Sequence, residues 1–444
     1  MAPVEPLRLP SSAPVVKAVE PVGDISDPNY RKREIGKSGL LQYAGRLYEE
    51  WMRELQGDRG RKNLGRMVTD EPFLAASDSA MRLLMRQVPW SVKAAGGDET
   101  AVHDQEFLTQ CMVDMSLTWS DFVDDVLSML RYGWSYFETV YKVRYRKGHE
   151  SRYNDGAVGW RKHALRPQES LDHWDFDASG GVQGMWQRDP TGAGLYLIPI
   201  EKALLFRTVR RKNSPEGASI YRGAWRPYKV KVILDVLEPI IIERDGTGIP
   251  KFEAPADYFQ ASNVKGQAFL AMLKQAGTDL KADEQQCLIA PQSYDAAGNK
   301  QFDYSLLSTP GRRSIEIREA IQARNVEMLM VTMTDFLLLG HANVGSFALS
   351  ADKSNLLSVA LTAYLDSIAQ VLNTYAVPRL FELNGWEREA YPEFVHGAVE
   401  KAGVATAAQI VSQLSSAGFP MPSALKISDE IMRRLDLPTS EDAQ

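Results

Sequence analysis

Three stretches in the second half of the chain carry apolar residues at helical spacing, over about residues 223–245, 312–339 and 352–375. The first is apolar on more than one side, with Val230, Ile233, Leu234, Leu237 and Ile241 on one face and Val232, Val236, Ile240 and Ile242 beside them. Such a helix needs packing partners on several sides. Pro239 predicts a kink or an end in the first helix, and Pro378 is expected to end the third.

The first half of the chain mixes helical and strand patterns. We expect helices over residues 38–55, 70–89, 103–115 and 118–132, with the charged segment "DRGRKNLGRM" as a connector after the first. Gly133 is a suitable helix stop. The alternating segments "WSVKAAG" and "WSYFETVYKVRYR" predict strands, and residues 151–206 predict short strands joined by turns. This half is therefore expected to be an α+β unit.

Residues 246–309 predict a small separate unit between the first two long helices. The segments "IPKFEA" and "QCLIAP" are typical of strands, "NVKGQAFLAMLKQAG" of a helix, and "KQFDYSLLS" of a last extended piece. Six prolines in residues 1–30 indicate a flexible arm, and residues 395–437 predict two or three short helices. "GHANVGSFALSADKS" interrupts the helical pattern, with Asp352 expected in the cap or first turn of the next helix.

Composition narrows the class of protein. A chain of 444 residues with 44% hydrophobic residues predicts two or three folded domains. The net charge of -6 argues against a protein that binds nucleic acid over its whole surface. Two cysteines far apart indicate a reducing compartment. We expect no signal peptide and no membrane span, because the stretch Leu329–Leu339 is short and contains Thr332, Thr334 and Asp335.

Catalytic motifs do not emerge from the sequence. It contains no phosphate-binding G-x-x-x-x-G-K-[ST] loop, no G-x-S-x-G and no H-E-x-x-H. Its six histidines are not at ligand spacing, and Asp124 with Asp125 is typical of a solvated helix face. We therefore expect no enzyme activity, no metal and no cofactor.

One stretch, residues 206–231, is strongly basic. Against the single acid Glu216 it carries Arg207, Arg210, Arg211, Lys212, Arg222, Arg226, Lys229 and Lys231. Two interpretations stay open: a solvated loop with salt bridges between subunits, or contact with DNA phosphates.

The order of these elements resembles the portal proteins of tailed bacteriophages. Three segments strengthen the resemblance, "SDSAMRLLMRQVPWSVKAA", "YGWSYFETVYKV" and "NSPEGASIYRGAWRPYKVK", each similar to a portal motif in the same order. The similarity covers roughly residues 60–390 and is closest to the group that includes the Mu-like phages. Pro239 departs from the pattern of a straight stem helix.

The resemblance implies a ring, typically a dodecamer, at one vertex of the capsid in the virion, with DNA passing through its central channel. It also implies that the ring assembles in the host cytoplasm. Its implied partners are double-stranded DNA, the terminase large subunit, a head-tail adaptor, and the major capsid and scaffold proteins. The implied fold is α+β, with these parts: N-terminal arm 1–30, wing 31–222, stem helices 223–245 and 310–339, clip 246–309, channel loop 340–352, wing return 353–395 and crown 396–444.

The resemblance also assigns roles to two groups of residues. Gly340 and Gly345 would let the channel loop bend, and His341, Asn343 and Ser346 would touch a phosphate backbone without holding it; taken alone, the segment is simply a loop. In the clip, Lys251, Lys265, Lys274 and Lys281 lie among acids and suit protein partners. Another ring-forming head-tail protein, a collar or adaptor, remains an alternative, as does a nucleic-acid enzyme with a scattered active site.

Overall fold

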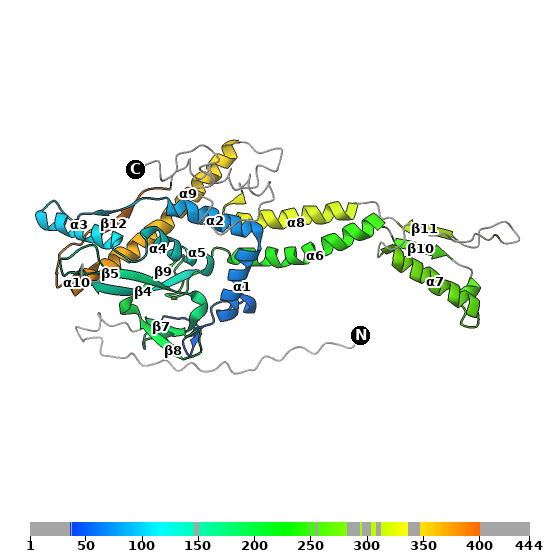
Figure 1. Cartoon of the computed structure of the whole chain (residues 1–444), viewed down its shortest axis with the longest axis horizontal. Helices are drawn as coiled ribbons and strands as arrows, with labels where there is room; N and C mark the ends of the chain where they lie inside the picture. Colours follow the sequence, from blue (N-terminus) through cyan, green and yellow to red (C-terminus); the bar gives the residue numbers. More distant parts are fainter. Residues whose placement is uncertain are drawn as a thin grey trace, which may run out of the picture.

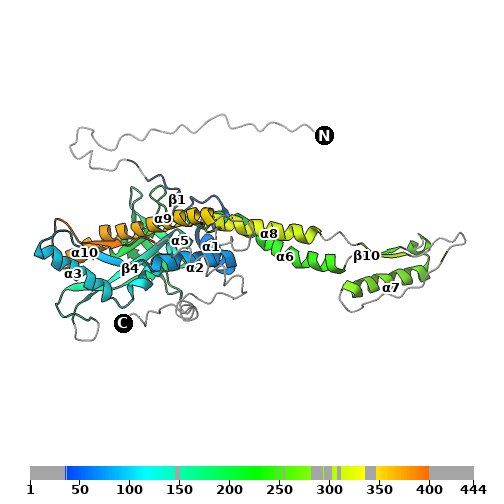
Figure 2. The same ribbon diagram turned by 90° about the horizontal axis from the view of Figure 1, so that it is seen from above.

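Two long antiparallel helices project from one side of a mixed body of helices and sheets, and a small unit sits at their far end (Figures 1 and 2). The computed structural model describes residues 36, 38–145, 151–247, 249–253, 256–281, 294, 303–307, 312–335 and 347–399. The predicted N-terminal arm, the crown beyond residue 399 and the strand "QCLIAP" lie outside these residues. The mixture of helix and sheet confirms the expected α+β class.

The body is built on a three-stranded antiparallel sheet with β4 in the middle. Strand β4 (Trp134–Val143) pairs with β5 (Val158–Arg166) on one side and with β9 (Ala203–Arg207) on the other. Most of β4 is buried, since five of its first six side chains are in the core. The aromatic, alternating sequence of this strand predicted its place correctly.

A second three-stranded sheet stands beside the first and has its own small core. It consists of β6 (Leu171–Phe176), β7 (Val182–Arg188) and β8 (Leu195–Pro199). Trp174 and Met185 from this sheet pack against Trp134 of the first. Short 3-10 helices, Gln168–Ser170 and Ile200–Lys202, join these strands to their neighbours.

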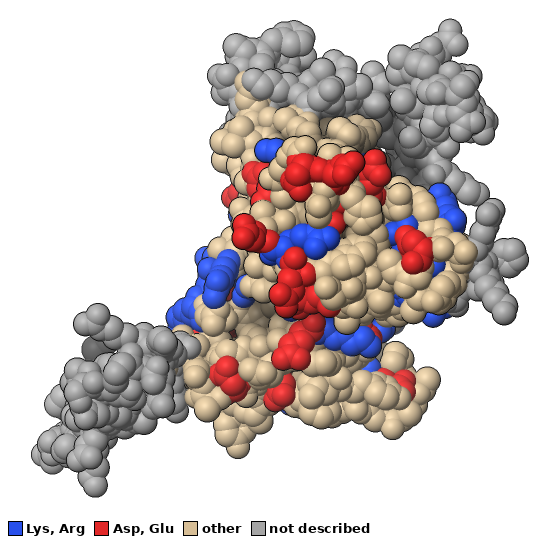
Figure 3. Space-filling view, turned by 90° about the vertical axis from the view of Figure 1, so that its left-hand side faces the viewer, with Lys and Arg blue, Asp and Glu red and all other residues tan. Residues whose placement is uncertain are grey.

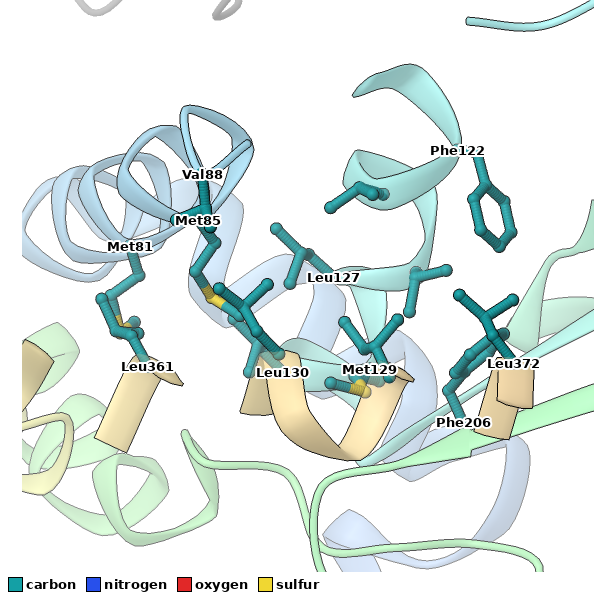
Figure 4. Packing of buried hydrophobic residues seen from close by; sticks show 14 of the residues in the cluster. Met81, Met85, Val88, Phe122, Leu127, Met129, Leu130, Phe206, Leu361 and Leu372 are labelled. Carbon is teal, nitrogen blue, oxygen red and sulfur yellow. The ribbon is translucent and has the colours of Figure 1, made fainter. Parts of the chain in front are cut away.

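Helices cover the central sheet and supply most of the main core (Figure 4). These are α1 (Gly57–Asp70), α2 (Pro72–Arg86), α3 (Glu99–Val113), α4 (Trp119–Val126), α5 (Ser128–Tyr132) and α9 (Phe347–Val371). Met81 and Met85 of α2 meet Leu361 of α9 in this core. Helices α4 and α5 follow the prediction, and Gly133 ends α5 in the left-handed conformation, φ 91°.

The helix predicted over residues 38–55 is wrong. The chain instead forms a small hairpin of β1 (Gln42–Tyr43) and β2 (Arg46–Leu47), followed by the 3-10 turn Arg53–Leu55. Ala44 and Gly45 both have positive φ, which makes a tight turn, and a Cβ on Gly45 would overlap the carbonyl of Trp174. The helix begins later, because the supposed connector carries Leu64, Met67 and Val68 on a buried face of α1.

The two projecting helices are α6 (Trp225–Thr247) and α8 (Arg312–Val331). Pro239 lies inside α6 and does not end it. Helix α8 ends at Val331, eight positions before the predicted Leu339. At the far end lie β10 (Ile249–Glu253), the 3-10 turn Ala256–Phe259, α7 (Val264–Lys281) and β11 (Asp303–Leu307), with β10 paired to β11.

Helix α9 also differs from the prediction at both ends. It begins at Phe347, so Asp352 lies inside the helix and not in its first turn. At the other end a π-helical turn, Leu372–Ala376, leads without a break into α10 (Val377–Leu383). Pro378 stands in the first turn of α10, directly after the π-helical turn, and therefore does not end the helical stretch.

The end of the described chain returns to its beginning. Strand β12 (Glu393–His396) pairs antiparallel with β3 (Trp90–Lys93). In the described residues one helical stretch, Asn355–Leu383, is long and apolar enough to cross a membrane by length and composition alone. Its residues Leu357, Leu361, Leu365 and Leu372 are buried in the body, so core packing accounts for its hydropathy.

Candidate functional site

Helices α6 and α8 pack on each other and leave broad apolar surfaces uncovered. On α6 the exposed apolar side chains are Val230, Val232, Ile233, Val236, Leu237, Ile240 and Ile242. Ile233 and Val236 are each 60% exposed, far more than a helix of a closed body would show. With 3.6 residues per turn, the residues from Val230 to Ile240 span about 160° of the helix circumference. We call these six residues the α6 stripe.

Helix α8 carries a narrower exposed row on its own outer side. Val326 is 40% exposed and Met330 is 59% exposed, one turn apart. On their inner sides the two helices meet each other, and an ion pair joins Arg318 to Glu238 at 3.0 Å. One copy of the chain therefore presents two different apolar surfaces, one on each helix.

The basic stretch lies at the base of this helical arm, and acids of the same chain form ion pairs with four of its eight basic residues. Lys212 contacts Glu49 at 2.7 Å, and Arg222 binds both carboxylate oxygens of Glu50, at 2.6 and 2.7 Å. Burial would raise the pKa of Glu50, but the hydrogen bonds from Arg222 and from the Met52 N–H outweigh it and lower that pKa. The segment around Glu49 thus covers part of the positive charge.

The same pattern continues up the first two turns of α6. Lys229 and the indole N–H of Trp225 both donate to Glu54, at 2.6 and 2.8 Å, and together lower the pKa of Glu54. Lys231 contacts Glu71 at 2.6 Å, and both side chains are more than nine-tenths buried. The ammonium of Lys231 also lies 5.2 Å from the ring centre of Phe73.

Of the remaining basic residues, Arg207 is half-buried and donates to the carbonyl of Ser214 at 2.8 Å, and the others are exposed at the base of the arm. Arg210 donates to Asn213, the positive charge of Arg211 helps to lower the pKa of Glu50, and Arg226 faces solvent without an acidic contact among the described residues. Salt bridges within one chain therefore account for half of this stretch, whereas the two interpretations from the sequence, salt bridges between subunits and contact with DNA phosphates, stay predictions. The sequence analysis missed the partner acids because it placed Glu49, Glu50 and Glu54 on a helix that does not exist.

Beneath the segment that carries Glu49 and Glu50 lies a cavity of about 540 Å³. Its lining combines apolar Leu47, Leu55 and Leu64 with charged Arg61, Arg211 and Glu216. The body end opposite the arm shows both signs of charge interspersed (Figure 3). Among the described residues, no group of His, Cys, Asp and Glu could hold a metal ion.

The predicted channel-loop residues Gly340, His341, Asn343, Gly345 and Ser346 lie outside the described residues. Their flanks are described: Thr332 and Thr334 are buried at the base of α8, and α9 starts at Phe347. Of the predicted clip lysines, Lys265 and Lys274 are exposed on α7, Lys281 is the last residue of that helix, and Lys251 belongs to β10. All four therefore belong to the unit at the tip of the arm.

Solved structures share this arrangement. A chain from the virion of a native gene transfer agent particle matches with a TM-score of 0.52 and 13% sequence identity, over 86% of this chain and 94% of that one. A chain from the neck of an empty gene transfer agent particle, computed with C6 symmetry, has the same score and identity, over 86% and 95%. At this identity the match indicates a common fold. Among curated proteins, none matches the chain significantly.

The family itself is identified from the sequence. The profile of the family described as "Portal protein of Mu bacteriophage" matches residues 64–435, which is most of the chain. That span includes the body, the helical arm and the unit at its tip. The protein therefore belongs to the Mu portal protein family, a family of structural phage proteins and not of enzymes.

Proposed function

We propose that the protein forms a cyclic homo-oligomer at one vertex of a phage capsid and serves there as the head-tail connector through which DNA passes. The observation that carries this proposal is the pair of uncovered apolar surfaces on α6 and α8. Exposed apolar area of this extent on a long helix marks a protein interface. Membership of the portal family supports the same conclusion.

The two surfaces differ, so contact between copies is head-to-tail. The α6 stripe of one copy packs against Val326 and Met330 on α8 of the next, and each copy repeats the contact. A heterologous contact of this kind closes into a ring when its rotation allows. Helix α6 then lies between α8 of its own copy and α8 of the next copy, which explains why its sequence is apolar on several faces.

The parts of the ring follow from this arrangement. The helical arm forms the stem, the unit at its tip forms the clip, and the body forms the wing. In residue numbers the assignments are wing 31–222 and 353–395, stem 223–245 and 310–339, clip 246–309, channel loop 340–352, N-terminal arm 1–30 and crown 396–444. Residues 347–352 belong to α9, so the irregular part of the loop is shorter than 340–352.

DNA passes such a channel by sliding and is not held tightly. Each phosphate that a protein neutralises adds affinity, so an unpaired basic lining would slow transport. The intrachain pairs of Lys212, Arg222, Lys229 and Lys231 neutralise half of the positive charges of residues 206–231. The clip, with Lys265 and Lys274 exposed, docks the terminase large subunit and then a head-tail adaptor, and the wing meets the capsid and scaffold proteins.

The decisive experiment is the oligomeric state of the purified protein and of two charge variants. Negative-stain microscopy and native mass spectrometry should show rings with a central hole for the wild type. The double variant Ile233→Lys/Val236→Lys should remain monomeric with its secondary structure intact. Asp235→Lys is the matched control, because Asp235 is exposed on the same helix outside the stripe, and it should still form rings.

Two results would contradict the proposal. One is a wild-type protein that stays monomeric at micromolar concentration under several salt conditions and with scaffold protein added. The other is normal rings from the double lysine variant, which would place the contact between copies elsewhere than the α6 stripe.

A further inference from the structure

Helix α8 stops at Val331 in a specific hydrogen-bonded turn. The N–H of Thr334 donates to the carbonyl of Leu329 at 3.0 Å, and the N–H of Met333 donates to the carbonyl of Met330 at 3.2 Å. These two bonds, with Met333 in the left-handed conformation at φ 58°, make a Schellman turn. The turn stands immediately before residues 336–346.

The residue in the left-handed position is unusual. Schellman turns favour glycine there, because a Cβ is strained at positive φ. Methionine makes the turn unfavourable by itself, and the apolar periodicity of the sequence favours a helix that continues to Leu339. Some other interaction must therefore stabilise the early end of α8.

Three buried hydroxyl groups supply that interaction. The Oγ of Ser77 on α2 lies 3.0 Å from Oγ1 of Thr332 and 2.9 Å from Oγ1 of Thr334. The two threonine hydroxyls are 2.7 Å apart, and Thr332 also donates to the Leu329 carbonyl at 3.1 Å. The exposed fractions of Ser77, Thr332 and Thr334 are 0%, 3% and 1%. We call these three residues the hydroxyl cluster.

The hydrogen bonds of the hydroxyl cluster can form in only one arrangement of α8 against α2. Each hydroxyl has one donor and accepts at least one bond, so the three groups and the Leu329 carbonyl can satisfy all three donors. Met328 and Leu329 beside them are buried and apolar, so water cannot replace a lost partner. A continued helix would turn Thr332 and Thr334 away from each other by about 200° and break the cluster.

We infer that Ser77, Thr332 and Thr334 are positioning residues that determine where α8 ends, shortly before residues 336–346 in the sequence. They hold the strained Met333 in place from α2, which belongs to the rigid core. The part that concerns the DNA channel rests on the function proposed above. The part that concerns the end of α8 does not depend on it.

Hydrogen exchange on the purified chain tests the local part. In Thr332→Val/Thr334→Val, which keeps the side-chain shape but removes both hydroxyls, amides of residues 332–334 should exchange about tenfold faster or more. Thr332→Ser/Thr334→Ser keeps the hydroxyls and should exchange like the wild type. Adding Met333→Gly to the valine pair should restore protection, because glycine removes the strain of the turn.

The control is Thr139→Val, which removes another buried hydroxyl, bonded to His163 at 3.2 Å on the central sheet. It should lower overall stability without selective loss of protection at residues 332–334. Unchanged exchange in the valine pair, or an equal effect from Thr139→Val, would overturn the inference.

Packaging tests the part that concerns the channel. Phage that carries the valine pair should assemble rings but package less DNA, and Met333→Gly in the same chain should restore packaging. Normal packaging by the valine pair would overturn the link to the channel. A wild-type chain that forms no rings would instead refute the proposed function and leave the exchange result intact.

Discussion

Lys231 and Glu71 form a buried ion pair, 2.6 Å apart, at the point where the helical arm leaves the body. Lys231 belongs to the second turn of α6, and Glu71 is the residue that precedes α2. The hydroxyl cluster joins α8 to the same helix, through Ser77. Helix α2 therefore holds both helices of the arm by polar contacts inside an otherwise apolar region.

Removing one partner of this ion pair should lower the stability of the folded protein. Lys231→Met leaves Glu71 charged and buried without a partner, so we expect the free energy of unfolding to fall by about 3–5 kcal/mol. Urea denaturation followed by circular dichroism measures it. Lys231→Met/Glu71→Leu should recover much of the loss, because both charges are then gone. Lys229→Met is the matched control at an exposed pair and should change little; a similar loss in both single variants would contradict a special role for burial.

The buried histidine of the central sheet predicts a fall of stability in mild acid. Burial lowers the pKa of His163 from 6.5 to about 3. Below pH 6.5 the histidine takes up a proton in the unfolded chain but stays neutral in the folded chain. The contribution of His163 to the free energy of unfolding is therefore fully present above pH 6.5 and is lost as the pH falls toward 3. Between pH 7 and pH 5 this amounts to about 2 kcal/mol, measured by denaturation at each pH.

The control for this effect is a variant without the titrating group. His163→Phe should flatten the dependence between pH 7 and pH 5, whatever its stability at pH 7. An unchanged slope in His163→Phe would mean that another group causes it.

A substitution at Arg226 should affect ring assembly without affecting the folding of the single chain. Its side chain is exposed at the base of α6 without an acidic contact in the described part of the chain, so Arg226→Glu should leave the thermal unfolding temperature unchanged. We expect it to lower ring assembly or packaging, measured by native mass spectrometry and phage yield. Arg226→Gln, which removes the charge without reversing it, should have a smaller effect. Phage yield equal to the wild type in Arg226→Glu would exclude a role for this residue.

The proposed channel loop gives a prediction about transport. Asn343→Lys/Ser346→Lys adds two positive charges where the proposed loop meets DNA, and each contact with a phosphate raises affinity and slows sliding. Packaging rate in an in vitro assay should fall, with the deficit decreasing at higher salt. Asn343→Gln/Ser346→Thr changes the same positions without charge and should package normally. Normal packaging by the lysine pair would mean that the loop does not line the channel.

Local pattern was enough for several helices and strands of the body. The alternation of β4 and the apolar faces of α2, α4 and α9 predicted elements that the structure has. It failed for residues 38–55, where leucines and aromatics at helical spacing hid the turn at Ala44 and Gly45. Nothing in the sequence nearby shows that a Trp174 carbonyl occupies the space a helix would need.

The ends of the long helices were hard to predict for a different reason. The end of α8 depends on Ser77, which is 255 positions away from Thr332 in the chain. The passage of α9 into α10 depends on a π-helical turn that accommodates Pro378. The acids that neutralise the basic stretch are likewise distant in sequence, so the pattern of charges within residues 206–231 could not reveal them.

The pairing of β12 with β3 constrains how the protein folds as it is made. Glu393 lies opposite Lys93, 300 positions earlier, and the arm and its tip are encoded between them. The β3–β12 sheet therefore cannot form until the ribosome has finished the whole arm, whose apolar α6 stripe is by then already synthesised. Contacts of such high sequence separation form slowly. Synthesis thus passes through a state in which the exposed apolar α6 stripe is complete and the β3–β12 sheet is not. In that state, contacts between nascent chains through the apolar stripe favour aggregation.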